Sequence, residues 1–369
     1  MSTPRTHAGA GFIDHRQHNT EATSTSMRVW ARSIGDRNPR YVNESYGPTG
    51  GSRYMAHPCW LYSVHDTVLE IGNAEHCALI AGTDWSFFRP VVVGERISTS
   101  ARLVSERAVT GRFAGPSMLQ TVEMQFLDAH DELLAVAVST LMRVDPALAR
   151  AQGKFSAWTR YKYTPAELNA VEAGYDAERV RGARPRYVED VSVGEDLPGL
   201  VRGPVTSEEI VMFVGCTRPI PAVSSFTHER NMGRLGGFIH ARTGTYETYA
   251  AGLVDDESAR QLGFPAAHDY GIDRISQLGS LVTNWMGDTG RLVKLNARLL
   301  APNMLGDTTW FSGKVSRLEV TSPRAGLVWL DVSGKNQRGE VTVAGSACVE
   351  LPLCSPDWNA LALHGSTKG

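Results

Sequence analysis

The sequence predicts an α+β protein made of two similar halves, each with a long buried helix followed by an antiparallel sheet. Three observations support this prediction. An apolar stripe with helical spacing follows Ala56-His57-Pro58, and the hydrophobic period then changes to two residues. A second stripe follows Ala267-His268. The separations of His57 from His268 and of Pro90 from Pro302 agree to within one residue, which indicates an internal duplication.

The first half is expected to begin with a short helix. Thr25 and Ser26 can cap it, and Gly35 ends it. A glycine-rich loop then leads to Pro58, which is well placed in a first helical turn, and the long helix follows with apolar positions from Leu61 to Ile71. Alternating segments from Ile97, at 118–127 and at 133–142 predict an antiparallel meander.

The second half is expected to repeat this order. Thr206 opens a helix that runs to Gly215, and Ile272, Ile275 and Val282 stand in the same register as the first stripe. Strands are expected at 308–320, 326–332 and 341–351. The predicted division is a flexible N-terminal arm (1–22), a first repeat (23–145), a connection (146–185), a second repeat (186–355) and a C-terminal tail (356–369).

Composition excludes several classes of protein. The formal net charge of −2 gives no basic surface for a nucleic acid, and no apolar run is long enough to span a bilayer. The polar start of the chain lacks the apolar core of a signal peptide. The five cysteines are scattered and form no Cys-x-x-Cys pair, so they are expected to be reduced. We therefore expect a cytoplasmic protein without a nucleic-acid or membrane partner.

A long helix wrapped by an antiparallel sheet is the hotdog domain, so two copies predict a double hotdog. At residues 35–41, Gly-Asp-Arg-Asn-Pro-Arg-Tyr, before a glycine-rich turn and a helix start, the sequence resembles the MaoC-like (R)-specific enoyl-thioester hydratases and dehydratases. The first half looks like their N-terminal, fatty-acid-synthase-type dehydratase domain. The second half, from Ala266 through Trp310, looks like the matching C-terminal hotdog.

This resemblance implies a hydro-lyase that adds water to an enoyl thioester or removes it from a 3-hydroxyacyl thioester. A carboxylate and a histidine would handle the water and the α-proton, while backbone N–H groups at the helix start would stabilise the enolate-like oxygen. The resemblance also implies a substrate on coenzyme A or an acyl carrier protein and a homodimer. No metal or other cofactor is expected.

The residues depart from the family pattern Gly-Asp-x-Asn-Pro-x-His in both halves. In the first, Asp36, Asn38 and Pro39 match, but Tyr41 takes the place of the histidine. A tyrosine, with an ordinary pKa of about 10, is a poor base at neutral pH, although it can still donate a hydrogen bond. In the second, the run 215–219 contains no aspartate.

In the second half, His240 best resembles the family histidine, and Asp269, directly after His268, is the nearest acid at a helix start. The leading hypothesis makes His240 the acid or base, Asp269 or Asp36 its partner, and the helix start at His268 the oxyanion donor. Histidines at helix starts are as often simple caps. The remaining candidates are His57 and Tyr41 for catalysis and, for substrate binding, Asn38, Tyr270, Gly271, Arg274 and Arg298.

Two alternatives stay open because neither half carries a complete acid-base pair in its motif. The first keeps the thioester and changes the reaction to hydrolysis by a thioesterase, or to another elimination or an isomerisation. The second is a non-catalytic subunit that binds and stabilises a partner hotdog protein.

Overall fold

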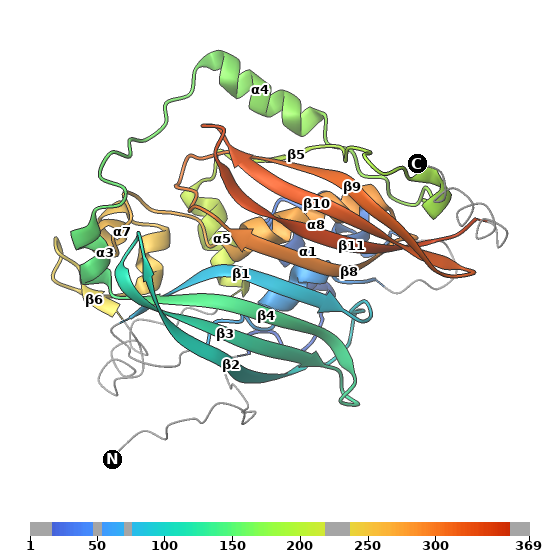
Figure 1. Ribbon diagram of the computed structural model, residues 1–369, viewed down its shortest axis with the longest axis horizontal. Coiled ribbons are helices and arrows are strands. Elements are labelled where there is room, and N and C mark those ends of the chain that lie inside the picture. Colours follow the sequence, from blue (N-terminus) through green and yellow to red (C-terminus); the bar gives the residue numbers. More distant parts are fainter. Residues whose placement is uncertain (1–16, 47–53, 70–75, 218–236, 355–369) are drawn as a thin grey trace, which may run out of the picture.

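One antiparallel sheet of nine strands organises the molecule, with the order β2-β3-β4-β1-β8-β11-β10-β9-β5 (Figure 1). The computed structural model describes residues 17–46, 54–69, 76–217 and 237–354. The nine strands are β1 (Cys77–Phe87), β2 (Ser98–Gly111), β3 (Gly115–Leu127), β4 (Leu133–Val144), β5 (Leu200–Arg202), β8 (Arg291–Leu299), β9 (Thr309–Ser322), β10 (Ala325–Asn336) and β11 (Val341–Pro352).

The two halves have the same strand topology and meet at their first long strands. β1 pairs with β4, and β8 pairs with β11. β1 and β8 pair with each other, from Gly82 opposite Arg298 to Ser86 opposite Lys294. Each half therefore forms one contiguous block of the sheet, as the internal duplication predicts.

The long helix α8 (Ile272–Met286) lies against this sheet, where it contacts β1 and the strands of the second half. All fifteen of its residues are buried. Its apolar positions face the core, and small hydroxyl side chains fit between them because they bond to the helix itself: the Ser276 hydroxyl donates to the Ile272 carbonyl at 2.7 Å. The predicted long helix of the second half is confirmed.

Shorter elements surround this core. Figure 1 shows α4 running outside the edge formed by β5, and α3, α7 and β6 gathered at one end of the sheet. Their bounds are α1 (Ser24–Ser33), α2 (Pro39–Val42), η1 (Pro58–Ser63), α3 (Pro146–Gln152), α4 (Pro165–Asp176), η2 (Val188–Asp190), α5 (Ser207–Thr217), β6 (Gly237–Ile239), β7 (Tyr246–Thr248), η3 (Tyr249–Leu253) and α7 (Asp256–Gln261).

The predicted long helix of the first half is wrong. In its place η1 makes a short 3-10 helix that ends at Ser63. Two side chains then bond to the backbone two residues further on: His65 Nδ1 accepts from the Thr67 N–H at 2.9 Å, and Asp66 Oδ1 accepts from the Val68 N–H at 3.1 Å. Thr67 adopts a φ of +64°. Such local bonds compete with helical ones, so residues 64–69 of the apolar stripe form no helix. Ile71, the last position of the predicted stripe, lies outside the described residues.

The strands expected in both meanders are present, but β1 and β8, which join the halves, were not predicted. Residues 17–22, expected to be part of a flexible arm, lie against the first half, since the Ala22 N–H donates to the Glu95 carbonyl at 2.8 Å. The first half thus begins before residue 23. The connection packs on both halves, because Phe155 contacts Phe113 of the first and Phe264 of the second.

No helix in the described part of the chain is long and apolar enough to cross a membrane.

Candidate functional site

Asp36 is held in the loop between α1 and α2. Gly35, with a φ of +73°, ends the α1 segment, a conformation that favours glycine. Asp36 Oδ1 accepts from the Asn38 N–H at 2.6 Å, and Oδ2 accepts from the Ser280 hydroxyl at 2.7 Å. Asn38 in turn caps α2. Because Ser280 belongs to α8, the first half's carboxyl group is positioned by the second half's helix.

His57 lies beside this carboxyl group at the start of η1. Its Nδ1 accepts from the Cys59 N–H at 3.1 Å, so the ring proton is on Nε2. Nε2 is 3.7 Å from Asp36 Oδ2, and both side chains are 0% exposed. Nε2 has no hydrogen-bond partner among the described residues. The Tyr41 ring packs edge-on against the imidazole, with 5.1 Å between ring centroids.

Burial sets the charge of this dyad, the pair Asp36 and His57. It raises the pKa of Asp36 above its ordinary value, although bonds from Ser280 and Asn38 and the charge of Arg202 oppose the shift. Burial lowers the pKa of His57 to about 3, so the imidazole is neutral at pH 7. It also raises the pKa of Tyr41, which stays protonated. The dyad thus places a carboxyl group with a raised pKa next to a neutral imidazole.

His57 and Tyr41 line a cavity of about 310 Å³, called here the dyad cavity. Met286, at the end of α8, and Leu292, near the start of β8, also line it. Arg89 and Arg291, also in the lining, carry carboxylate partners, Glu95 and Glu350 respectively. The dyad cavity therefore lies between the two halves, with charged side chains in its wall.

The second helix start forms a separate site. His268 Nδ1 lies 3.0 Å from the Asp269 carbonyl oxygen, which can only accept, so Nδ1 carries the proton and Nε2 a free lone pair. Nε2 is buried and has no hydrogen-bond partner among the described residues. Burial lowers the pKa of His268, which is neutral at pH 7.

Asp269 is engaged in a buried ion pair. Its Oδ2 accepts from Arg274 Nε at 2.5 Å, and its Oδ1 accepts from Arg274 Nη2 and from the Asn303 N–H. Arg274 also donates to the carbonyls of Ala301 and Thr342. These bonds leave the carboxylate little freedom to move a proton. Tyr270, for its part, donates to Asp66 Oδ2 at 2.7 Å.

His268, Asp269, Tyr270, Gly271 and Arg274 all line a second cavity of about 230 Å³. Most of its other walls are apolar, and we call it the apolar cavity. It adjoins the start of α8, whereas the dyad cavity adjoins its end. A helix of fifteen residues is about 22 Å long, and the two cavities adjoin its opposite ends. The residues predicted from the sequence are thus divided between two sites.

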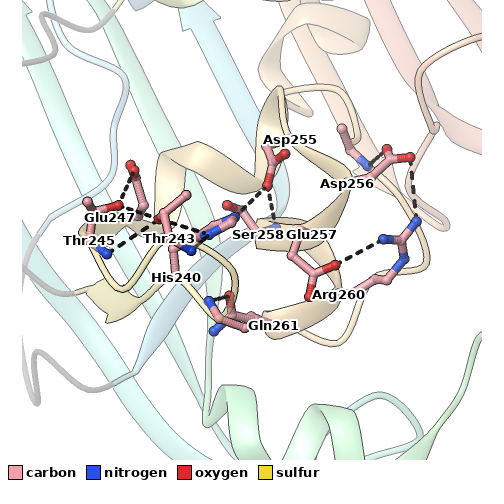
Figure 2. Close-up of polar contacts among 12 residues, drawn as sticks. His240, Thr243, Thr245, Glu247, Asp255, Asp256, Glu257, Ser258, Arg260 and Gln261 are labelled. Carbon is pink, nitrogen blue, oxygen red and sulfur yellow. Dashed lines mark hydrogen bonds and ion pairs between the residues drawn. The ribbon is translucent and has the colours of Figure 1, made fainter.

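His240 belongs to neither set of described lining residues. Figure 2 shows it in the turn after β6, where Nε2 lies 3.3 Å from Asp255 Oδ2 and Nδ1 accepts from the Thr243 N–H at 3.2 Å. The predicted pairing of His240 with Asp269 or Asp36 is therefore wrong. Its ring serves a local network, because Asp255 also caps α7.

Arg298, predicted to bind substrate, makes two hydrogen bonds to Asp84 across the β1 and β8 pair, at 2.7 and 2.6 Å. Sequence reasoning missed Ser280. Its signal was a buried polar face of the helix, on which Ser280 lies with Ser276, Gln277, Thr283 and Asn284. Among the described residues, no group of three or more His, Cys, Asp or Glu side chains is arranged to hold a metal ion.

Comparison with known proteins places this geometry in context. Residues 8–137 match the family model described as the FAS1-like dehydratase domain region, which confirms the resemblance of the first half. A solved structure named MaoC-like dehydratase superposes with a TM-score of 0.63 at 17% identity, covering 94% of this chain and 98% of that one. A Mycobacterium tuberculosis protein described as a double hotdog gives 0.52 at 13% identity, covering 94% and 97%.

This chain is a double hotdog. A putative MaoC domain dehydratase from Chloroflexus aurantiacus is also similar, with a TM-score of 0.58 at 13% identity, and covers 94% of this double hotdog and 96% of its own chain. The comparison with curated proteins gave no match. Both members of the dyad, Asp36 and His57, fall inside the matched dehydratase region.

Proposed function

We propose that this protein is a hydro-lyase that interconverts an enoyl thioester and a 3-hydroxyacyl thioester at the dyad cavity. One observation carries the proposal. A buried carboxyl group and a buried imidazole, 3.7 Å apart, lie within a segment that matches a dehydratase region. We expect the substrate to carry coenzyme A or a carrier-protein arm, no cofactor to be needed, and the protein to act as a cytoplasmic homodimer.

In the dehydration direction one group takes the α-proton, the carbon–oxygen bond breaks, and that proton is returned to the departing hydroxyl group, which leaves as water while a hydrogen-bond donor assists its departure. Asp36 is suited to exchange the proton, because burial raises the pKa of its carboxyl group and so favours the protonated acid after transfer. His57 is suited to donate a hydrogen bond through its Nε2–H, which has no partner among the described residues. Tyr41, protonated beside it, is a second donor.

The test is turnover of a panel of enoyl and 3-hydroxyacyl thioesters, followed by the ultraviolet absorbance of the conjugated enoyl group. We expect Asp36→Asn and His57→Gln to reduce kcat/KM by about 100-fold or more, as loss of an acid-base group does. His240→Ala, at a buried histidine outside both cavities, is the matched control and should change kcat/KM less than about twofold.

Two results would contradict the proposal. A folded wild-type protein that converts no member of the panel is not a hydro-lyase of this class. Loss of turnover in His240→Ala or Asp269→Asn, with Asp36→Asn unaffected, would move the reaction to the second half. The assay also separates the alternatives, since release of free thiol identifies a thioesterase, and turnover that requires another chain identifies a stabilising subunit.

A further inference from the structure

The apolar cavity has no part in the proposed reaction, because neither Asp36 nor His57 is among its lining residues. It adjoins the start of α8, whereas the dyad lies beside Gly279 and Ser280, roughly 12 Å further along the helix. Leu79 and Ile80 from β1, with Phe113, Phe264 and Leu299, contribute its apolar walls. Its volume of about 230 Å³ is below the roughly 300–1,000 Å³ of pockets for drug-sized ligands. It therefore suits a small ligand with an apolar body.

His268 gives this cavity one specific polar requirement. The residue is 9% exposed and lines the cavity, and its Nδ1–H is held by the Asp269 carbonyl. Nε2 is on the other side of the ring and has no partner among the described residues. A buried acceptor without a donor is costly, so a ligand that supplies an O–H gains from meeting it. A carboxylate could not serve, since it has no proton to donate.

Lys154 adds a second requirement. Its ammonium group lies 5.1 Å from the centroid of Phe155, and both residues line the cavity. No ion pair in the described part of the chain involves Lys154, whereas Arg274, the other cation of this wall, is paired with Asp269. Lys154 is an exposed residue, so it presents this positive charge at the solvent side of the cavity, where it favours an anionic group on the ligand.

We propose that the apolar cavity is a second ligand site, which binds a small hydroxylated carboxylic acid through its alkyl body, its hydroxyl at His268 and its carboxylate at Lys154. The site is distinct from the dyad, so its occupation does not depend on the hydro-lyase reaction. Binding involves no covalent step.

The test is isothermal titration calorimetry on the full chain, so its readout is independent of turnover. The probes are ω-hydroxybutanoate, ω-hydroxyhexanoate and ω-hydroxyoctanoate, each compared with the unsubstituted acid and the plain alcohol of equal length. We expect saturable binding at one site per chain for at least one hydroxy acid. The unsubstituted acid should bind about tenfold more weakly, because it leaves His268 Nε2 unpaired.

Variants assign each contact. His268→Phe keeps a ring and removes the acceptor, so the hydroxy acid and the plain acid should bind equally. Lys154→Met should weaken both acids up to about fivefold and leave the alcohol unchanged. Ala250→Trp fills the cavity and should abolish binding of every probe, whereas Ala241→Trp, an exposed alanine on the neighbouring turn, should not change it. Asp36→Asn should retain full binding.

The proposal is overturned if no probe binds the folded wild-type protein saturably. It is equally overturned if Ala250→Trp, shown by circular dichroism to be folded, binds as the wild type does, because the ligand would then occupy another site. Should Ala250→Trp fail to fold, Ala78→Trp fills the same cavity from β1 and gives the same decision. Failure of binding with hydro-lyase activity intact removes this site alone.

Discussion

Three buried histidines show how local hydrogen bonds fix the position of a proton. His57 accepts at Nδ1 and keeps its proton on Nε2, where it faces Asp36. His268 donates through Nδ1 and keeps a lone pair on Nε2. His240 accepts at Nδ1 from Thr243 and turns Nε2 toward Asp255. The three rings thus differ at Nε2. This atom is a hydrogen-bond donor in His57 and an acceptor in His268, and in His240 it lies next to Asp255.

Burial of His57 predicts a pH dependence of stability. Because its pKa falls from 6.5 to about 3 on folding, the unfolded chain binds a proton that the folded chain refuses between these values. The stability that the protein keeps with His57 neutral is fully present above pH 6.5 and is lost as the pH falls toward 3. Between pH 7.5 and 4.5 the free energy of unfolding should fall in both proteins. The fall should be about 2 to 3 kcal/mol smaller in His57→Gln, which cannot titrate, than in wild type.

Urea unfolding at the two pH values measures this difference. The matched control is His130→Gln, a histidine in the exposed turn between β3 and β4, which should lose the same stability as wild type. Equal acid sensitivity of wild type and His57→Gln would show that the imidazole is not buried in its neutral form.

The sequence could identify Asp36, His57 and His268 as candidates but not their partners. Asp36 is recognised by its motif, yet the hydroxyl that bonds to it is on Ser280, far along the chain. His240 was recognised by its neighbours in sequence, and its ring turned out to face Asp255 instead. Partners of this kind are set by how α8 crosses the first half, which residue spacing does not encode.

At the scale of elements, α8 packs on the strands of the second half and reaches β1 and η1 of the first half. The first half's own helix is reduced to η1, because the bonds made by His65 and Asp66 turn the chain away from helical geometry. Gly279 lets α8 approach η1 closely: a Cβ there would lie 3.0 Å from both Cys59 Sγ and His57 Cε1. Glycine is used here for close packing beside the dyad.

Gly279→Ala should therefore destabilise the protein by about 1 to 3 kcal/mol and lower hydro-lyase turnover, because overpacking displaces His57. Gly215→Ala is the matched control. That glycine is exposed on α5, and a Cβ there meets nothing within 4 Å, so the substitution should stabilise the protein by up to about 1 kcal/mol. Thermal unfolding of both variants checks the prediction, and a Gly279→Ala variant as stable as Gly215→Ala would contradict the close approach.

Element prediction succeeded where one physical signal dominated. The stripe of α8 and the alternation of β10 and β11 gave their positions directly. β1 was missed because its sequence includes Ala81, Gly82 and Asp84, residues disfavoured in isolated strands. It is stabilised by neighbours on both sides, β4 and β8. The prediction of the first-half helix was wrong although its apolar residues have helical spacing. Hydrogen bonds from the His65 and Asp66 side chains to the backbone interrupt the helix.

At the scale of the whole molecule, one strand pair makes two repeats into a single sheet. Gly82 lies at that pair, where a Cβ would come 2.4 Å from the Ala297 carbonyl oxygen and 2.8 Å from Arg298. The two cavities lie at opposite ends of the same junction: residues near the start of β1 line the apolar cavity, and Phe87, at its end, lines the dyad cavity. Separation of the halves would therefore open both.

Gly82→Val should push the halves apart and destabilise the protein by about 2 to 3 kcal/mol. Differential scanning calorimetry should show one cooperative transition for wild type and two overlapping transitions for the variant. Gly111→Val is the matched control, since a Cβ at the end of β2 meets nothing within 4 Å, and should keep a single transition near the wild-type Tm. One unshifted transition in Gly82→Val would mean that the β1 and β8 contact does not couple the halves.

The hydrogen bond from Ser280 to Asp36 also determines whether the first half can be separated from the second. The chain repeats in sequence, but the first repeat does not contain what its own carboxyl group needs, because the hydroxyl comes from the second. A chain that contained the first repeat alone would keep Asp36 but would lack the Ser280 hydroxyl that bonds to it. The two halves therefore depend on each other at this carboxyl group, and a substitution at Ser280 in the second repeat changes the support of a motif in the first.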